Sequence, residues 1–254
     1  MSALLDISGV TVRFGGVTAI DDVSFSLDEG ELLGLIGPNG AGKTTMLRSI
    51  TGVVRPAAGT VTLGGEDISG LPIHARVRRG LGLSQQLVSP FRQMTVLDNV
   101  ALTAGSARTR DPLRALFATS RTAERARARE LLELVGIAEA AESAPSALPL
   151  GYLKRLEMAR ALALDPRLLL LDEPLAGLNH IEAGRLADTI RELNGRGLSI
   201  ILIEHNLGEV MRVCSRLVVL DNGRTIGDGV PAEVMADGRV RAAYLGVEAG
   251  DAAA

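Results

Sequence analysis

The sequence predicts an α/β protein with a mostly parallel core sheet, an antiparallel β subdomain and an inserted helical subdomain. Near-continuous apolar runs are typical of parallel strands that are covered on both faces. Such runs occur at ELLGLIG (31–37), LLLLDE (168–173), SIILIEH (199–205) and RLVVLDNG (216–223). Alternation of apolar and polar residues is typical of antiparallel strands with one exposed face. It occurs at residues 4–12, 23–27 and 59–63.

Residues 95–165 follow helical periodicity instead, and we expect them to form the inserted subdomain. The helical segments are TVLDNVALTA (95–104), TAERARARELLELVG (122–136) and LPLGYLKRLEMARAL (148–162). In the last of these, Leu156, Met158, Ala159 and Leu162 are spaced to face a core. We therefore expect one domain over 1–254. Its parts are the core with the antiparallel strands (1–83 and 166–228), the helical subdomain (84–165), and a C-terminal helix and tail (229–254).

Composition limits the classes of protein to which this chain can belong. Of 254 residues, 46% are hydrophobic, which is enough for a sizeable core, and the net charge of −3 argues against a general binder of nucleic acid or anionic membranes. We find no signal-peptide pattern at the start and no apolar run long enough to span a membrane. The single cysteine, Cys214, excludes an internal disulfide. These features predict an intracellular protein.

Lysine is rare in this chain. It occurs only at Lys43 and Lys154, so 25 of the 27 basic residues are arginines. Such a preference for arginine over lysine is typical of a bias in the composition of the genome that encodes the protein. We expect a lysine that is retained against this bias to be required as lysine.

The segment 106–130 is rich in arginine, with seven arginines and three acidic residues. A nucleic-acid patch is one interpretation, but Phe117 is the one aromatic residue available there for stacking on bases. The alternative is a solvated helix face, which we favour. We assign this segment no chemistry.

The segment GPNGAGKTT (37–45) follows an apolar strand and precedes a helical pattern, and it matches G-x-x-x-x-G-K-[ST]. Its glycines allow the backbone N–H groups to face phosphate oxygens, and the following helix N-terminus adds positive potential. Lys43 supplies a charge for the β- and γ-phosphates, and the Thr44 hydroxyl can ligate Mg²⁺. We expect this phosphate loop to bind a nucleoside triphosphate. Its residues are Gly37, Pro38, Asn39, Gly40, Ala41, Gly42, Lys43, Thr44 and Thr45.

Two further strand ends carry candidate catalytic side chains. Asp172, at the end of LLLLDE, can hold Mg²⁺, and the adjacent Glu173 can act as general base toward water. His205 ends another apolar run, so we expect it to meet Lys43 and Asp172 at one edge of the sheet and to sense the γ-phosphate. His74 and His180 lack such a placement, and we interpret both as surface residues.

The order of these motifs resembles the nucleotide-binding subunit of an ABC transporter, over essentially the whole chain. The resemblance implies a P-loop NTPase fold of ABC type that binds ATP and Mg²⁺. It implies a Q-loop glutamine at Gln86, with Gln85 as the other possible register, that contacts Mg²⁺ and communicates with a membrane subunit. It implies a D-loop at Gly177, Leu178 and Asn179, with Asn179 where aspartate is common. Phe14 falls where an aromatic residue stacks on adenine, although a core role is the alternative.

The segment LPLGY (148–152) aligns with the family signature LSGGQ, which covers the ATP of a partner subunit. Leu148 and Gly151 are retained, whereas Pro149, Leu150 and Tyr152 replace serine, glycine and glutamine. Proline removes a hydroxyl and an N–H, yet it suits the start of a helix. Two interpretations follow for this segment. Either it still supports turnover of the partner's ATP despite its altered residues, which we favour, or it covers a site that binds ATP and turns it over slowly.

Three segments narrow the resemblance to the ATP-binding subunits of branched-chain amino-acid importers. They are FGGVTAI (14–20), FRQMTVLDNV (91–100) and VRAAYLG (240–246). This family implies a second, different ABC ATPase subunit, two membrane permease subunits and, indirectly, an extracytoplasmic solute-binding protein. It implies no nucleic-acid partner. It also implies a peripheral location on the cytoplasmic face of the plasma (inner) membrane.

Other functions within and outside this class remain open. An importer for another small solute and a lipid or lipopolysaccharide exporter are the nearest alternatives. A soluble ABC ATPase acting on DNA or ribosomes is disfavoured, since no long coiled coil separates Lys43 from Asp172 and the chain holds one nucleotide domain. Intact Glu173 and His205 disfavour a non-hydrolysing regulatory subunit.

Overall fold

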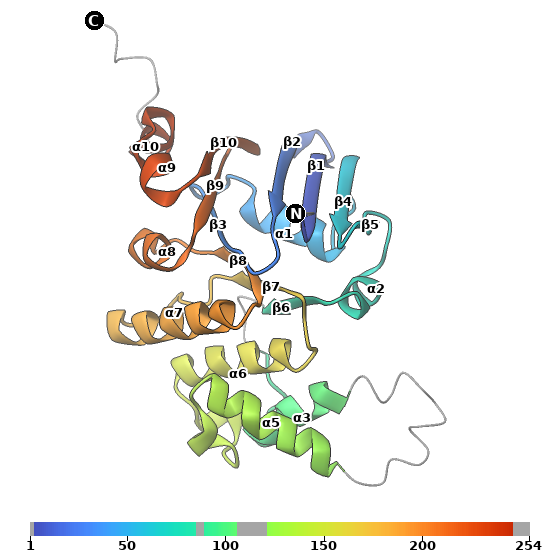
Figure 1. Cartoon of the computed structure of the whole chain (residues 1–254), viewed down its shortest axis with the longest axis vertical. Coiled ribbons are helices and arrows are strands. Elements are labelled where there is room, and N and C mark those ends of the chain that lie inside the picture. The colour runs from blue at the N-terminus through green and yellow to red at the C-terminus, as the bar shows by residue number, and fades with distance from the viewer. Residues whose placement is uncertain (1–2, 85–88, 106–120, 246–254) are drawn as a thin grey trace, which may run out of the picture.

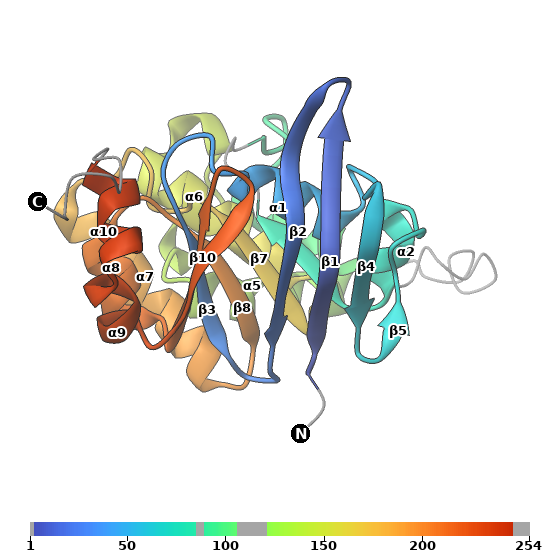
Figure 2. The same ribbon diagram turned by 90° about the horizontal axis from the view of Figure 1, so that it is seen from above.

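A computed structural model describes residues 3–84, 89–105 and 121–245, and its larger sheet has six strands in the order β10-β9-β3-β8-β7-β6. Figures 1 and 2 show this sheet at the centre of the molecule. Its pairs are parallel, except that β10 runs antiparallel to β9. The four apolar runs thus form parallel strands, as predicted. The strands are β3 (Leu32–Ile36), β6 (Leu81–Ser84), β7 (Leu168–Asp172), β8 (Ser199–Ile203), β9 (Arg216–Asp221) and β10 (Arg224–Gly229).

The smaller sheet has the strand order β2-β1-β4-β5, and the pairs β1–β2, β1–β4 and β4–β5 are antiparallel. At one end of β1, Leu5 lies opposite both Leu27 of β2 and Leu63 of β4, and all three are buried. The three alternating segments therefore form antiparallel strands, as predicted. The strands are β1 (Leu5–Phe14), β2 (Val17–Leu27), β4 (Ala58–Leu63) and β5 (Glu66–Asp67).

The larger sheet separates two hydrophobic clusters. In β3, Leu33 and Leu35 pack with the smaller sheet, whereas Leu32 and Ile36 pack with helices on the opposite face. This division follows from the two-residue side-chain period of a strand. It explains why the strand is apolar at nearly every position, since neither face meets water.

Helices cover both faces of the larger sheet. The helix α1 (Lys43–Thr51) packs on the side of the smaller sheet through Met46, Leu47 and Ile50. Leu186, Val210 and Val234, from three further helices, join the opposite cluster. The remaining helices of this part are α2 (Ile73–Arg78), α7 (His180–Gly195), α8 (Leu207–Val213), α9 (Pro231–Ala236) and α10 (Gly238–Leu245).

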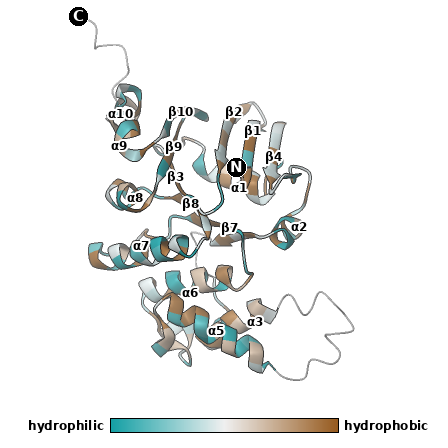
Figure 3. Cartoon of the chain, viewed as in Figure 1, coloured by the Kyte–Doolittle hydropathy of each residue, from teal (hydrophilic) through white to brown (hydrophobic). Residues whose placement is uncertain are grey.

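A separate group of helices lies at one end of the molecule, below the sheets in Figure 1. It contains α3 (Val96–Ala104), α5 (Thr122–Leu134) and α6 (Leu150–Leu162), with short 3₁₀ turns at Ala138–Ala140 and Pro145–Ala147. Figure 3 shows hydrophobic and hydrophilic residues interspersed along α5 and α7. On α6, Leu156, Met158, Ala159 and Leu162 are all buried, so the predicted core face is confirmed.

Two strands of the larger sheet were not predicted. They are the edge strands β6 and β10. β6 has four residues and pairs with β7 from Leu81 to Ser84. In the described ranges, no helix has the length and apolarity needed to cross a membrane.

Candidate functional site

The phosphate loop leaves the end of β3 and turns into α1. Gly37, Gly40 and Gly42 have φ values of 148°, 82° and 103°, which side chains strongly disfavour. A Cβ on Gly37 would lie 2.0 Å from the carbonyl oxygen of Leu220, so only glycine fits against β9. Gly42 caps α1 without a side-chain bond, and the first N–H groups of a helix have no partner within it. The loop can therefore present these donors to an anion.

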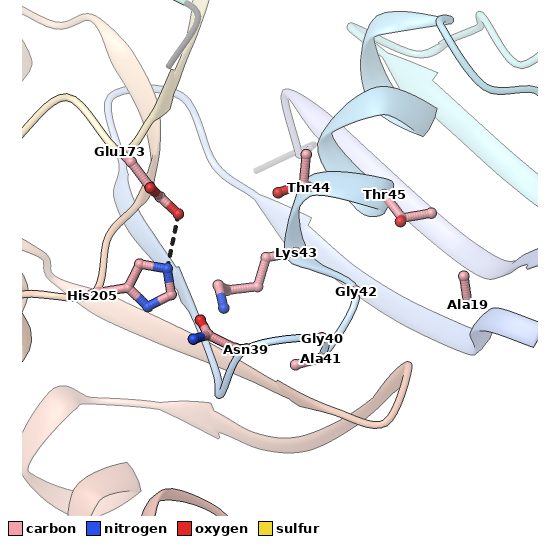
Figure 4. Close-up of a pocket in the computed structure, with 10 residues that line it drawn as sticks. All are labelled: Ala19, Asn39, Gly40, Ala41, Gly42, Lys43, Thr44, Thr45, Glu173 and His205. Carbon is pink, nitrogen blue, oxygen red and sulfur yellow. Dashed lines mark hydrogen bonds and ion pairs between the residues drawn. The ribbon is translucent and has the colours of Figure 1, made fainter. Parts of the chain in front are cut away.

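Lys43 lies across the mouth of this loop. Its Nζ donates hydrogen bonds to the carbonyl oxygens of Gly37, at 2.7 Å, and Pro38, at 2.9 Å. Burial lowers the pKa of Lys43, while the nearby charges of Glu173 and Asp172 raise it. Figure 4 shows its side chain extending toward His205 and Asn39. The ammonium group thus lies where the loop, two carboxylates and a histidine meet.

Glu173 and His205 come from neighbouring strands. β7 and β8 are parallel, with Asp172 opposite Ile203, so the residues after them emerge side by side. His205 Nε2 lies 2.8 Å from Glu173 Oε1, as the dashed line in Figure 4 marks. Both residues line one pocket together with Ala19 and residues 39–45 of the phosphate loop. The structure therefore brings together the strand-end residues that the sequence singled out.

The oxygen donors beside this pocket fit a magnesium ion. Mg²⁺ in nucleotide sites takes one or two protein oxygens together with phosphate and water oxygens. Thr44 lines the pocket, and Asp172 is a buried carboxylate whose pKa is raised by burial and by the charge of Glu173. Within the described residues, no cluster of three or more His, Cys, Asp or Glu forms an all-protein metal cage. Gln86, the third expected ligand, lies outside the described residues.

Glu204, which directly precedes His205, is a further residue of the site that the sequence patterns did not single out. Its side chain is 3% exposed, and burial raises its pKa. Glu204 Oε1 accepts a hydrogen bond from the N–H of Leu175 at 2.5 Å, and Oε2 accepts one from the N–H of His205 at 3.2 Å. One carboxylate thus fixes the main chain after both β7 and β8. An acidic residue within an apolar strand pattern was the signal that could have revealed it.

The segment 148–152 lies at the start of α6, away from the phosphate loop of this chain. Pro149 is the N-cap residue, and none of the residues that line the loop pocket comes from this segment. Leu150 is 43% exposed, and a Cβ on Gly177 would lie 2.9 Å from its Cδ2. Tyr152 donates a hydrogen bond from its hydroxyl to Glu139 Oε1 at 2.6 Å, which raises the pKa of Tyr152. Leu148 packs partly buried against the core, and Gly151 is buried.

The segment 177–179 connects β7 to α7. Gly177 has a φ of 80°, and Asn179 is the N-cap of α7. Asn179 Oδ1 accepts a hydrogen bond from the N–H of Glu182 at 2.9 Å, and Glu182 Oε2 accepts one from the N–H of Asn179 at 3.3 Å. Asparagine therefore caps this helix as aspartate would. Leu178 lines a cavity of about 400 Å³ together with Gly151 and Tyr152.

Phe14 ends β1 beside the turn to β2 and is 49% exposed, so its interpretation as a core residue is wrong. The neighbouring strand β2 reaches the phosphate loop, because Ala19 lines the pocket. A Cβ on Gly42 would lie 2.8 Å from the Ala19 carbonyl oxygen. Phe14 thus belongs to a hairpin that borders the site.

The remaining sequence-level expectations concern surface residues. His74 and His180 are exposed, as expected. Of the arginine-rich segment, residues 106–120 lie outside the described residues, Arg121 is the N-cap of α5, and residues 122–130 are on that helix. There Arg125 forms an ion pair with Asp98 at 3.0 Å, and Arg127 one with Glu130 at 3.0 Å. This part is the solvated helix face that we favoured.

Comparison with known proteins identifies the family. A family model described as ABC transporter matches residues 20–176, and one described as branched-chain amino acid ATP-binding cassette transporter matches residues 224–250. A crystal structure of the ADP conformation of an ATP-binding cassette of an ABC transporter superposes with a TM-score of 0.85 at 29% identity, covering 97% of this chain and 100% of that one.

Similar proteins serve both lipopolysaccharide export and branched-chain amino acid transport. The lipopolysaccharide export system ATP-binding protein LptB of Escherichia coli (strain K12) is 37% identical over 96% of this chain and 98% of its own length. The high-affinity branched-chain amino acid transport ATP-binding proteins LivG of Salmonella typhimurium and BraF of Pseudomonas aeruginosa are 39% and 37% identical, each over 96% of this chain and 98% of their length. The chain therefore belongs to the ABC transporter family, as an ATPase subunit that binds ATP with Mg²⁺.

Proposed function

We propose that this subunit powers an importer for branched-chain or other hydrophobic amino acids. The observation that carries this substrate class is the match of residues 224–250 to the branched-chain amino acid family model. The relatives LivG and BraF support the same class. A second candidate is a lipid or lipopolysaccharide exporter, which the similarity to LptB favours. An importer for another small solute is a further alternative.

In the proposed nucleotide complex, the N–H groups of residues 39–45 surround the phosphates of ATP. Lys43 exchanges its bonds to the Gly37 and Pro38 carbonyls for the β- and γ-phosphate oxygens. Phe14 stacks on the adenine from the hairpin beside the loop. The pocket that residues 39–45 line together with Glu173 and His205 supports this proposal.

For hydrolysis, we assign Glu173 as the general base that takes a proton from the water attacking the γ-phosphate. His205 contacts the same carboxylate at 2.8 Å, so it can hold Glu173 in place and face the γ-phosphate. Thr44, Asp172 and Gln86 would hold Mg²⁺. When bound, that ion neutralises charge on the β- and γ-phosphate oxygens.

The assembly we propose pairs this chain with a second, different ABC ATPase subunit. Residues 148–152 then cover the partner's ATP, and residues 177–179 lie at the same interface. Two permease subunits and, indirectly, an extracytoplasmic solute-binding protein complete the importer, at the cytoplasmic face of the inner membrane. Within the chain, 1–83 and 166–228 act as the core, 84–165 as the helical subdomain that contacts a permease, and 229–254 as the C-terminal part.

The role of Glu173 is tested by Glu173→Gln in the assembled transporter. We expect ATP affinity to be retained and turnover to fall by about 100-fold or more, because the amide cannot accept the proton. Glu133→Gln, on an exposed face of α5, is the matched control and should leave turnover unchanged. Near-normal turnover in Glu173→Gln would remove Glu173 as the base.

The substrate class is tested by copurifying the chain with its membrane partners and reconstituting the complex in liposomes. We expect ATP hydrolysis to be stimulated by a solute-binding protein loaded with leucine or isoleucine. Stimulation by lipopolysaccharide without any binding protein would instead support the exporter. Equal stimulation by unloaded and leucine-loaded binding protein would contradict the proposed substrate.

A further inference from the structure

Lys154 connects the signature helix to the catalytic segment of the same chain. It lies in the second turn of α6, the helix that follows residues 148–152. Its side chain is 6% exposed, and its Nζ donates a hydrogen bond to the main-chain carbonyl oxygen of Glu173 at 3.2 Å. A buried ammonium group requires such compensation.

Acidic groups surround this lysine. Burial lowers its pKa, while the charges of Glu204, Glu173, Asp172 and Glu157 raise it. Glu157 is on α6 itself, and the other three follow or end β7 and β8. The cation thus bridges α6 and the segment after β7, and acidic groups of the candidate site act on its charge. The other lysine of the chain, Lys43, lies on the side of the phosphate loop.

The main chain at Glu173 adopts an unfavourable conformation. Its φ is 51°, in the left-handed region that non-glycine residues rarely adopt. Such a conformation persists only where its surroundings hold it. The N–H of Glu173 donates to the Ile203 carbonyl oxygen at 2.9 Å, and Glu204 accepts from the N–H of Leu175. Lys154 supplies the contact to the Glu173 carbonyl group.

We propose that Lys154 is a positioning residue that fixes the main chain of Glu173, and thereby joins the helix covering a partner's ATP to the base acting on this chain's own ATP. The inference rests on the proposed role of Glu173 as the base. Lys154 itself does not touch the nucleotide. Its effect comes through the aim of the Glu173 carboxylate, because a displacement of about 1 Å can lower a rate by roughly 100-fold.

The test is Lys154→Met in the full-length chain assembled with its partner subunits. We expect kcat for ATP hydrolysis to fall by about tenfold to 100-fold, with KM for ATP changed by less than about twofold, since the phosphate loop is untouched. Lys154→Arg retains a charged donor and should recover part of kcat. A residue with a purely structural role would not separate kcat from KM in this way.

Arg155→Met is the matched control, one position along the same helix. Arg155 Nη1 donates to the Val135 carbonyl oxygen at 2.6 Å and to Thr189 Oγ1 at 3.0 Å, so its loss removes hydrogen bonds of the same helix without touching Glu173. We expect its kcat to stay within about twofold of the parent. A kcat of Lys154→Met equal to that of Arg155→Met would overturn the proposal.

Two further measurements distinguish a positioning role of Lys154 from other roles. If Lys154 served only to balance the charge of Glu204, adding Glu204→Gln to Lys154→Met would restore kcat, and that result would also overturn the proposal. ATP should raise the thermal midpoint of each variant equally, which shows that folded protein is compared. If Lys154→Met does not fold, Lys154→Gln replaces it, because its side chain is too short to reach Glu173. We expect the same fall in kcat, and a kcat equal to that of Arg155→Met would again overturn the proposal.

Glu173→Gln measured in parallel distinguishes the two proposals. If turnover is lost in Glu173→Gln but normal in Lys154→Met, Glu173 remains the general base and only the positioning role of Lys154 is rejected. Normal turnover in Glu173→Gln rejects the base assignment itself.

Discussion

The phosphate loop (37–45) and the signature segment (148–152) are both expected to contact ATP, yet different forces shape them. The loop is shaped by its main chain, because its glycines have positive φ and Lys43 bonds to carbonyl groups of Gly37 and Pro38. The signature segment is shaped by distant residues. Leu150 lies against Gly177, and Tyr152 is bonded to Glu139.

This difference explains why one segment matches its family pattern and the other departs from it. A side chain at Gly37 would collide with the backbone of β9, so the loop tolerates no change there. In the signature segment, the exposed Leu150 and the N-cap Pro149 leave the helix start intact. Backbone geometry limits the first segment, whereas in the second a helix begins at Leu150 after an N-cap Pro149.

The largest effect is expected from Gly37→Ala compared with Gly40→Ala. The added Cβ at Gly37 would lie 2.0 Å from the Leu220 carbonyl oxygen, whereas at Gly40 no heavy atom lies within 4 Å. We expect Gly37→Ala to abolish measurable ATP binding. Gly40→Ala should lower the free energy of unfolding only by the strain of a left-handed alanine, about 1–2 kcal/mol. Titration with ATP and thermal unfolding check both, and equal losses would show that the close contact does not limit the loop.

A smaller effect is expected from Pro149→Ser combined with Leu150→Gly, which restores two residues of the family pattern. If residues 148–152 support normal turnover with their present side chains, turnover of the assembled transporter should change by less than about twofold, or under ~0.5 kcal/mol in barrier height. The single change Pro149→Ser separates the two positions. A clear rise in turnover would support the other reading, in which this segment slows the partner's site.

The smallest effect is expected from Tyr152→Phe. The hydroxyl of Tyr152 lowers the pKa of Glu139 from its ordinary value of 4.5. A lowered pKa means that the bond stabilises the folded protein above about pH 4.5 and that this contribution is lost as the pH falls further. Because the pair is exposed, the free energy of unfolding should drop by under about 1 kcal/mol at pH 7.

Urea unfolding of Tyr152→Phe and its parent at pH 7 and near pH 3.5 checks this expectation. The difference between the two proteins should shrink at the lower pH. A difference that persists there would assign the stabilisation to packing of the ring instead of to the bond with Glu139.

Much of the fold follows from local patterns in the sequence. The apolar runs predicted the buried parallel strands, and the alternating segments predicted the antiparallel sheet. The edge strand β6 was not predicted, because four residues that include Gly82 carry no clear periodicity. It becomes a strand because β7 offers it a parallel partner from Leu168 to Leu171.

For the candidate site, the sequence by itself determined the phosphate loop, Asp172, Glu173 and His205, because each follows a recognisable strand and carries its own chemistry. The tertiary structure decided which side chains support them. The acidic Glu204 stands out in its apolar run, but its bond to the N–H of Leu175 and the bond of Lys154 to Glu173 join residues far apart in the chain, which no local spacing reveals. The rarity of lysine marked Lys154 as required, but its contact with Glu173 exists only where α6 packs beneath the end of β7. Burial and long-range contact, which sequence periodicity does not encode, are the physical reason for this division.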